Sequence, residues 1–357
     1  MDKKRWGLRP ERQRMDTHDL RKNNEISDLM TLKNFDLSAG LDSLNPAFAS
    51  LAMRAGWNKK EASLWQEPRV SFKSTHWKWT EAQAGLDAAA PLISTELAER
   101  RNLFLVNPIE GNHYATLRTL VSAYQMIRPG EQARSHRHSP NALRLVLEVG
   151  PDVYTVVDGE RLDMKINDVV LTPGNMWHGH ANDGPSDAYW IDFLDVPLVQ
   201  MLEPMFMEHW PQGFQEPDRA NQSKELCFPW AQVEARLLAQ MAESQGGKIA
   251  RVVLDAPSLL TMELAMTMLA PGASTSNHRS TENQIVAVVE GHGETCVGGQ
   301  TFRWERGDVL ALPGWLPVQH FAKGVRSTLF SVSDARMQER LGFLRTEDMS
   351  GVLAHGQ

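Results

Sequence analysis

Three histidines in the middle of the chain have the spacing of metal ligands. His136 and His138 are separated by one residue, and residues two apart on a β-strand point to the same face. Both imidazoles can therefore reach one ion, while Arg137 between them must face the other way. His178 follows a Pro-Gly turn after another apolar run, so a neighbouring strand can supply it as the third ligand. Imidazole suits zinc, copper, iron and nickel.

An isolated His-x-His pair is more often ordinary surface or core histidine, so the surrounding elements decide the interpretation. From about residue 120, short β-rich runs alternate with Gly and Pro turns, which is typical of an all-β sandwich or barrel. The strands predicted to position the histidines are Thr119–Ile127, Leu143–Val149, Val153–Val157, Asp168–Thr172 and Tyr189–Phe193.

The strand-rich region occurs twice in the chain. Ile127-Arg-Pro-Gly-Glu matches Leu269-Ala-Pro-Gly-Ala, and Ser135-His-Arg-His matches Asn277-His-Arg-Ser, both at an offset of 142 residues. The run from Asn167 to Gly174 matches the run from Gly307 to Gly314 at an offset of 140 residues. A near-constant offset indicates a duplicated β domain.

The second copy does not keep the metal ligands. His278 is retained, whereas Ser280 and Val318 stand where the other two histidines would be. One imidazole holds a divalent ion poorly, so we expect the second barrel to be structural. His320, which aligns with His180 of the first copy, is then a relic.

The remaining segments flank and join the two copies. We predict a mixed helical and extended N-terminal arm that packs on a barrel or on a neighbouring subunit, and a helical linker containing a helix over Trp230–Met241. Within the arm, helices are expected over residues 27–32 and 94–101, and an extended run over Arg69–Trp79. The predicted domains are 1–118 (arm), 119–197 (first barrel), 198–250 (linker), 251–340 (second barrel) and 341–357 (tail).

Composition excludes several classes of protein. The 357 residues exceed one ordinary core, the net charge is −7, and 42% of residues are hydrophobic. Nucleic-acid and membrane partners are therefore not expected, and no secretory signal or 18-residue apolar run is found. Cys227 and Cys296 lie far apart without a Cys-x-x-Cys spacing, which argues against a disulfide framework or a zinc-thiolate site. We expect a cytoplasmic protein.

The frame around the histidines resembles both signature motifs of the cupin superfamily. The matching positions are Gly130, His136, His138 and Gly150 in the first motif and Pro173, His178 and Asn182 in the second. The chain departs from the pattern where cupins usually carry a glutamate ligand, since that position falls at Leu143 or Ala142. The first shell of ligands is then three neutral histidines, which favours an anionic bidentate ligand such as a carboxylate plus a phenolate.

Longer stretches are similar to the bicupin gentisate 1,2-dioxygenases, a pattern shared by salicylate and 1-hydroxy-2-naphthoate dioxygenases. The similar segments are Glu99–Pro108, Pro129–Arg144, Leu171–Asn182 and Trp190–Pro197, within a resemblance over roughly residues 60 to 345. The resemblance implies an all-β bicupin fold, with two double-stranded β-helix (jelly-roll) barrels. It also implies Fe(II), dioxygen, a small aromatic carboxylate, a homotetramer, and extradiol-type cleavage between the carboxyl-bearing and hydroxyl-bearing ring carbons.

The same resemblance assigns roles to residues around the triad. Arg144 matches the partner of the substrate carboxylate, and Gln125 a residue close to substrate and oxygen. His180 and Asp192 match an acid/base pair, and Arg100 matches a further pocket arginine, although Arg101 is adjacent.

Three of these roles can also be argued from the residues, each beside a structural alternative. Arg144 lies six residues after His138, so a regular strand points it into the barrel, where its planar fork suits a carboxylate. Alternatively, it pairs with an internal Asp or Glu. His180, oriented by Asp192, can take a phenolic proton; the alternative is a loop hydrogen bond to backbone. Gln125 is otherwise an ordinary strand residue.

Other functions and substrates stay open from the sequence alone. Another metal-dependent cupin enzyme, such as an isomerase, and a non-enzymatic small-molecule-binding cupin are the competing classes. Within the ring-cleaving family, gentisate is the first choice, and salicylate, 5-aminosalicylate and 1-hydroxy-2-naphthoate are alternatives. Val121 and Ala123 precede Gln125 on the same strand face and are expected to shape the pocket.

Overall fold

The computed structural model describes residues 41–57, 63–94, 101–243 and 247–351. The chain divides into two compact units, residues 1–67 and 68–357. In the first unit, α2 (Leu41–Ser50) brings Phe48 to an edge-to-face contact with Trp57, with ring centroids 6.0 Å apart. The helix predicted over 27–32 lies outside the described residues, as does most of the one predicted over 94–101. Arg101 at its end begins a strand instead.

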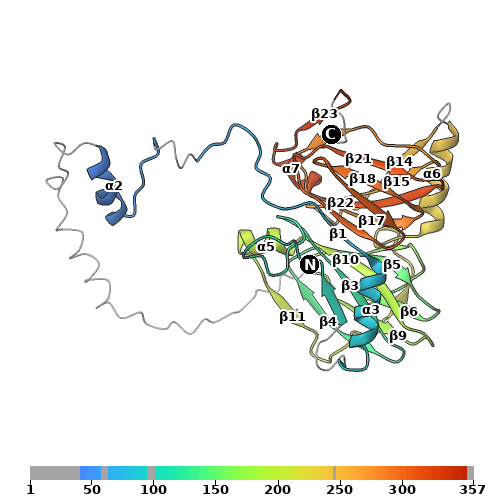
Figure 1. Ribbon diagram of the computed structural model, residues 1–357. Helices are drawn as coiled ribbons and strands as arrows, with labels where there is room; N and C mark the ends of the chain where they lie inside the picture. Colours follow the sequence, from blue (N-terminus) through green and yellow to red (C-terminus); the bar gives the residue numbers. More distant parts are fainter. Residues whose placement is uncertain (1–40, 58–62, 95–100, 244–246, 352–357) are drawn as a thin grey trace, which may run out of the picture. The chain divides into compact units, whose positions relative to one another are not determined.

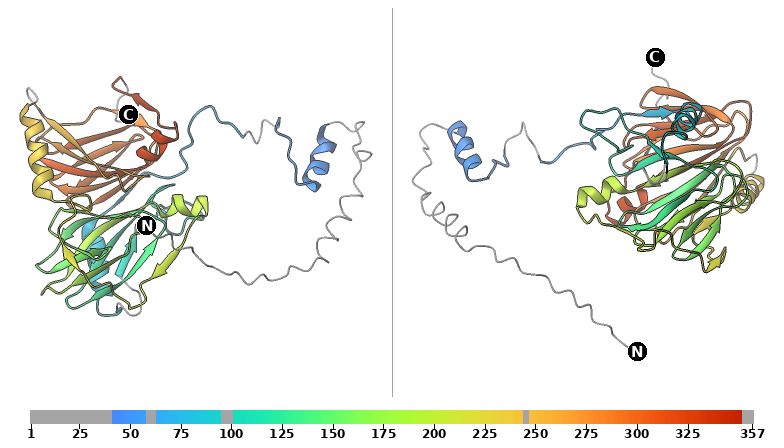
Figure 2. Two further views of the ribbon diagram at one scale, coloured as in Figure 1. Left: turned by 180° about the vertical axis from the view of Figure 1, so that it is seen from behind. Right: turned by 90° about the horizontal axis from the view of Figure 1, so that it is seen from below.

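The second unit contains two barrels, drawn in green and in orange to red in Figures 1 and 2. The first barrel has one sheet in the order β13-β8-β5-β10-β3-β2 and another in the order β11-β4-β9-β6-β7-β12. The first sheet contains β2 (Arg101–Phe104), β3 (Val121–Ile127), β5 (Ala142–Glu148), β8 (Val169–Thr172), β10 (Ala188–Leu194) and β13 (Cys227–Phe228). The second contains β4 (Gln132–His138), β6 (Val153–Val157), β7 (Glu160–Asp163), β9 (His178–Asn182), β11 (Met207–His209) and β12 (Arg219–Ala220). The five strands predicted for this barrel are confirmed as β3, β5, β6, β8 and β10.

The second barrel repeats this plan. Its sheets have the orders β1-β20-β17-β22-β15-β14 and β19-β18-β21-β16-β23. The first contains β1 (Thr75–Trp77), β14 (Ile249–Leu254), β15 (Glu263–Leu269), β17 (Gln284–Glu290), β20 (Val309–Leu312) and β22 (Ser327–Ser333). The second contains β16 (His278–Ser280), β18 (His292–Val297), β19 (Gln300–Glu305), β21 (Val318–Ala322) and β23 (Thr346–Asp348). The all-β fold of two jelly-roll barrels is confirmed, and the segment predicted as a tail adds β23.

The arm and the linker each contribute a strand to a sheet of one barrel and a helix that packs on the other barrel. From the arm, β1 pairs with β20 of the second barrel, while α3 (Trp79–Ala89) packs on β2 and β3 of the first. From the linker, β13 pairs with β8 of the first barrel, while α6 (Trp230–Glu243) packs on β14 and β15 of the second. The helix predicted over Trp230–Met241 is thus confirmed, and the two strand–helix units correspond to each other.

Two equivalent aspartates anchor these helices. Asp308 of the second barrel accepts the Trp79 N–H at 2.9 Å, and Asp168 of the first accepts the Trp230 N–H at 2.7 Å. The first backbone N–H groups of a helix lack partners within the helix, so a carboxylate there stabilises its start. Each helix is therefore held by the barrel on which it does not pack.

Reciprocal hydrogen bonds join the barrels further. Thr119 donates to Asp334 at 2.6 Å, and Thr261 donates to Asp195. Phe193 and Phe330 meet edge to face between the barrels, with ring centroids 5.6 Å apart, inside one continuous apolar core. The two barrels consequently behave as one folded body.

Short helices complete the second unit: α5 (Val196–Leu202) after β10 and α7 (Ala335–Arg340) after β22. In the described part of the chain, no helix has the length and apolar character needed to span a bilayer.

Candidate metal centre and substrate pocket

The three predicted ligands converge inside the first barrel. His136 on β4 is the cross-strand neighbour of His178 on β9, and His138 ends β4 on the same face. The ligand atoms of the three imidazoles all lie within 4.8 Å of one another. Ring centroids are 4.5 Å apart for His136 and His178, and 4.8 Å apart for His138 and His178. The sequence spacing therefore produces a three-histidine face on adjacent strands.

Backbone carbonyls fix the protonation of all three rings. The Nδ1 atoms of His136, His138 and His178 lie 3.1, 2.8 and 3.0 Å from the carbonyl oxygens of Arg134, Pro140 and Met176, respectively. A carbonyl oxygen can only accept, so each Nδ1 carries the proton and each Nε2 presents a lone pair. Such an arrangement is typical of metal-binding histidine.

No carboxylate completes this ligand set at the usual cupin position. Ala142 pairs with Thr172 across β5 and β8, and it lies on the same face of β5 as Arg144. Of the two positions considered from the sequence, Ala142 is therefore the one that faces the interior, and a methyl group cannot bind an ion. Three neutral imidazoles leave a divalent ion its full positive charge and open positions. The described residues thus fit Fe(II), among the metals that accept imidazole.

Arg144 is buried beside the triad, but not through the regular strand that its spacing from His138 predicted, because β4 ends at His138 and Arg144 lies on β5 of the other sheet. Its side chain is 1% exposed, and its guanidinium lies 5.3 Å from the centroid of the Trp190 ring. Its NH1 group lies 2.6 Å from His180 Nδ1 and 3.1 Å from Thr155 Oγ1. Because arginine has only donors, His180 Nδ1 accepts in this arrangement. Trp190 thus belongs to the pocket.

Asp192 joins Arg144 to Gln125. Its carboxylate accepts from Gln125 Nε2 at 2.6 Å and lies 3.6 Å from Arg144 Nε. The internal carboxylate partner that the sequence left open for Arg144 is therefore present. Arg144 contacts both Asp192 and His180, so it connects the predicted acid/base pair. Gln125 Oε1 and Trp190 Nε1 are buried and have no hydrogen-bond partner among the described residues.

Of the other residues predicted around the site, three are described by the structure and one is not. Arg137 faces outward as expected, where it pairs with Glu208 at 2.6 Å and lies 4.8 Å above the Trp177 ring. Ala123 is the cross-strand neighbour of Asp192, and Val121 that of Leu194, so both share the Gln125 face. Arg100 lies outside the described residues.

Two residues that lie next to the site were not predicted from the sequence. Thr155 on β6 is fully buried and contacts both Arg144 and His180. His209 on β11 is the cross-strand neighbour of His136, with ring centroids 6.5 Å apart. The signal that could have indicated Thr155 is a threonine at the centre of the otherwise apolar strand β6. No periodicity marks a three-residue strand such as β11.

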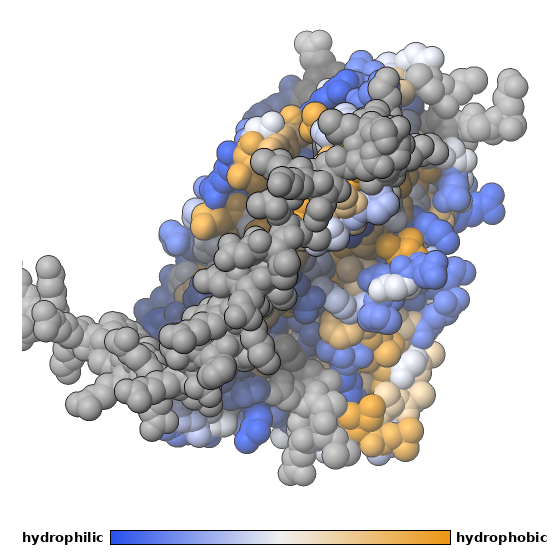
Figure 3. Space-filling model, turned by 90° about the vertical axis from the view of Figure 1, so that its left-hand side faces the viewer, coloured by the Kyte–Doolittle hydropathy of each residue, from blue (hydrophilic) through white to orange (hydrophobic). Residues whose placement is uncertain are grey.

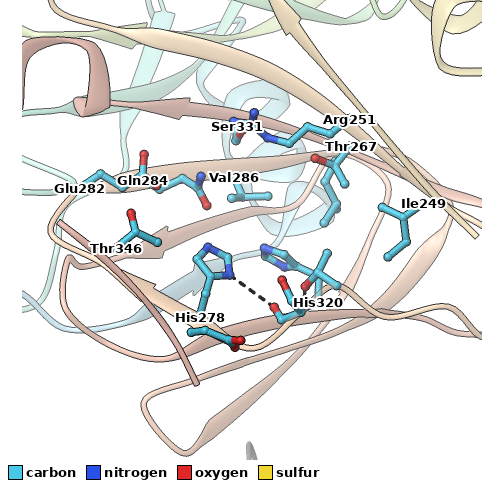
Figure 4. Close-up of a pocket in the computed structure, with 14 residues that line it drawn as sticks. Ile249, Arg251, Thr267, His278, Glu282, Gln284, Val286, His320, Ser331 and Thr346 are labelled. Atoms are coloured by element: carbon cyan, nitrogen blue, oxygen red, sulfur yellow. Dashed lines mark hydrogen bonds between the residues drawn. The ribbon is translucent and has the colours of Figure 1, made fainter. Parts of the chain in front are cut away.

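The second barrel lacks the triad, and other residue types stand at the interior positions that correspond to the pocket of the first barrel. Val286 pairs with Ser331 as Arg144 pairs with Asp192. Thr267 pairs with Leu329 as Gln125 pairs with Trp190. His320 remains, and Figure 4 shows it beside His278 on one wall of a pocket. Burial, followed by the nearby His278, lowers the pKa of His320 from 6.5 to about 4.

This buried histidine is expected to make stability depend on acid pH. The unfolded chain binds a proton at His320 below pH 6.5, whereas the folded chain resists until about pH 4. Stability is therefore lost as the pH falls through this window, by up to about 3 kcal/mol. Urea unfolding at stepped pH should show a shallower loss for His320→Gln. Equal slopes for the two proteins would contradict the assignment.

Known proteins share this architecture. A cupin domain model matches residues 123–195 and 265–330. A 5-aminosalicylate 1,2-dioxygenase of Comamonas sp. is 32% identical, over 86% of this chain and 90% of the relative. A gentisate 1,2-dioxygenase of Aquipseudomonas alcaligenes is also 32% identical, over 81% of this chain and 91% of the relative. Among solved structures, a variant of salicylate 1,2-dioxygenase from Pseudoaminobacter salicylatoxidans in complex with gentisate superimposes with a TM-score of 0.81 at 26% identity. That match covers 90% of this chain and 97% of the variant's chain. The chain belongs to the bicupin gentisate 1,2-dioxygenase family, the ring-cleaving 1,2-dioxygenases of hydroxylated aromatic acids.

Proposed function

We propose that the protein is an Fe(II)-dependent extradiol-type dioxygenase that incorporates both atoms of O2 into an ortho-hydroxy aromatic carboxylate. The single observation that carries this proposal is the buried arginine beside three histidines with no carboxylate ligand. A dication held only by neutral ligands and an adjacent guanidinium both favour an anionic substrate. When bound, Fe(II) supplies the redox chemistry that activates dioxygen towards the ring.

The chain's own residues bind and orient the substrate in this proposal. Arg144 holds the carboxylate through its planar fork, and Gln125 and Trp190 use their buried polar atoms against the ring substituents or oxygen. His180 accepts the phenolic proton at Nδ1. That atom now accepts from Arg144, so movement of the guanidinium onto the substrate carboxylate makes its lone pair available. Substrate binding and base activation are thereby coupled, with Asp192 positioning the arginine.

The bond cleaved lies between the carboxyl-bearing and hydroxyl-bearing carbons. Gentisate is the proposed main substrate, and salicylate, 5-aminosalicylate and 1-hydroxy-2-naphthoate are the alternatives. The named relatives include a 5-aminosalicylate, a 1-hydroxy-2-naphthoate and several gentisate dioxygenases. Identities near 30% to each do not separate them.

A substrate panel tests the proposal. After anaerobic loading with Fe(II), the four acids are mixed with aerated buffer, and oxygen uptake and ultraviolet spectra are followed. Oxygen consumption with a new absorption band of a ring-opened product is expected for at least gentisate. Iron-loaded protein that turns over none of the four would exclude ring cleavage of this substrate class. It would favour another cupin enzyme or a binding protein.

We also propose a cytoplasmic homotetramer. Exposed apolar side chains follow one another along and after α5, at Met201, Leu202, Met205, Phe206 and Met207. Figure 3 views the side on which α5 and β11 lie in Figure 1 and shows apolar residues gathered at its lower right. Exposed apolar clusters often mark subunit contacts. Light scattering after gel filtration is expected to give four times the chain mass, and a monomeric mass would refute the assembly.

A further inference from the structure

The interior of the second barrel contains a cavity that the ring-cleavage chemistry does not use. Its volume is ≈ 550 Å³, and it opens beside the outer strand β14. Figure 4 shows Arg251, Thr267 and Ser331 across the cavity from His278 and His320. Protein interiors are otherwise close-packed, so a space large enough for a small organic molecule calls for an explanation.

Smaller side chains create this space. The strand registers place Val286 where the first barrel has Arg144, and Leu329 where it has Trp190. Two of the bulkiest interior side chains of the first barrel are thus replaced by a valine and a leucine. Together with Ile249, they give the cavity an apolar wall.

A cation lines the open side of the cavity, at a position where the first barrel has none: the side chain of Arg251 is 49% exposed. Arg251 on β14 pairs with Thr267, as Asn102 on β2 pairs with Gln125. Its NH2 group donates to Glu263 at 2.7 Å, and a guanidinium has five N–H donors. Further donors of the same fork therefore remain for a ligand.

Two imidazoles and two carboxyl groups belong to the polar lining, at His278, His320, Glu282 and Asp348. Trp304 Nε1 donates to Thr295 Oγ1 at 2.9 Å, so the Thr295 hydroxyl donates onward to His320 Nδ1 at 2.7 Å. His320 consequently carries its proton on Nε2. The carboxyl group of Glu282 also lines the cavity, and burial raises its pKa. Asp348 also lines the cavity, but its carboxylate accepts from the N–H and the hydroxyl of Ser350.

We propose that this cavity is a second, metal-independent binding site for a small organic carboxylate. The carboxylate pairs with Arg251, and the apolar body lies against Ile249, Val286 and Leu329. The Arg251 guanidinium, the Nε2–H of His320 and an apolar wall suit this ligand class. The second barrel then has a binding function of its own although its metal ligands are lost.

Equilibrium dialysis of the anaerobic, iron-loaded protein with salicylate tests the proposal, since no turnover occurs without oxygen. Two molecules are expected per wild-type chain. Arg251→Gln should weaken the binding of one of them by roughly 10- to 100-fold, the effect of losing a charged hydrogen bond. Arg144→Gln should remove the other, so the two sites are counted independently of whether the protein cleaves rings. Arg303→Gln, an exposed arginine of β19, is the matched control and should still bind two.

A second variant fills the space. Leu329→Trp installs the residue type that the first barrel carries at Trp190, and it should also lose one molecule while Arg144-dependent binding is kept. Unchanged salicylate binding in Arg251→Gln would overturn the proposal. So would a wild-type chain whose only salicylate is the one that Arg144→Gln removes.

Discussion

Replacing His136 with alanine is expected to remove both the bound iron and the activity. Loss of a hydrogen-bond partner of a metal-binding histidine typically costs 10- to 100-fold, so loss of a ligand itself should lower kcat/KM by at least ~10³-fold. The remaining His138 and His178 offer only two imidazoles, and Ala142 cannot replace the third. Iron content by mass spectrometry and oxygen uptake are measured on the same sample.

His292→Ala is the matched control. His292 begins β18 on the exposed side of the second barrel, where its backbone oxygen accepts from the Ser327 hydroxyl and the Lys323 N–H. Iron content and rate should both be those of the wild type. If His136→Ala bound one iron per chain and cleaved substrate at the wild-type rate, the three-histidine site would be wrong.

The second large effect is expected at Arg144. Arg144→Gln removes the charge that pairs with the substrate carboxylate, and breaking a buried charged pair costs about 2–5 kcal/mol. That loss corresponds to a decrease in kcat/KM of roughly 30- to 5,000-fold, expressed mainly as a higher KM. Steady-state oxygen uptake over a range of gentisate concentrations measures both constants. Iron content should be retained because Arg144 binds no metal.

Two variants separate recognition of the carboxylate from general damage. Arg144→Lys keeps the charge but not the planar fork, so its activity should fall between those of the wild type and Arg144→Gln. Arg128→Gln alters an exposed arginine of the first barrel, which lies 3.8 Å from Asp187, and should leave KM unchanged. A wild-type KM for Arg144→Gln would refute its role. It would leave the contact with Asp192 as the reason for its burial.

The sequence predicted the pair of ligands on β4 because a strand has a strict period of two. His136 and His138 are two residues apart on β4, which places them on one face without any tertiary information. Arg144 lies on β5 in the other sheet, after a turn, so its even spacing from His138 is not what brings it into the interior. Thr155 and the route from Asp192 through Arg144 to His180 depend on which strands face each other across the barrel. That arrangement is not contained in any single stretch of sequence.

The exchange of strand–helix units between barrels was also beyond the sequence. β1 lies within the extended run predicted over Arg69–Trp79, whose last residue begins α3 instead, but that prediction did not say which barrel the strand joins. β13 has two residues, too few for an alternating pattern. Their pairing is fixed by long-range contacts such as those of Asp308 and Asp168 with the helices that follow. The loss of two ligands in the second barrel could be predicted by comparing the two copies of the repeat position by position. Its cavity could not be predicted, since it arises from side-chain volumes at Val286 and Leu329 that become neighbours only in the fold.

The most direct test of ring cleavage by a dioxygenase is turnover under ¹⁸O₂. Iron-loaded protein is given gentisate in labelled oxygen, and the product is analysed by mass spectrometry. We predict one oxygen molecule consumed per substrate and both labelled atoms in a ring-opened product, with no reaction by His136→Ala treated with Fe(II) in the same way. A product carrying one labelled atom, or one formed without oxygen, would contradict the proposed function.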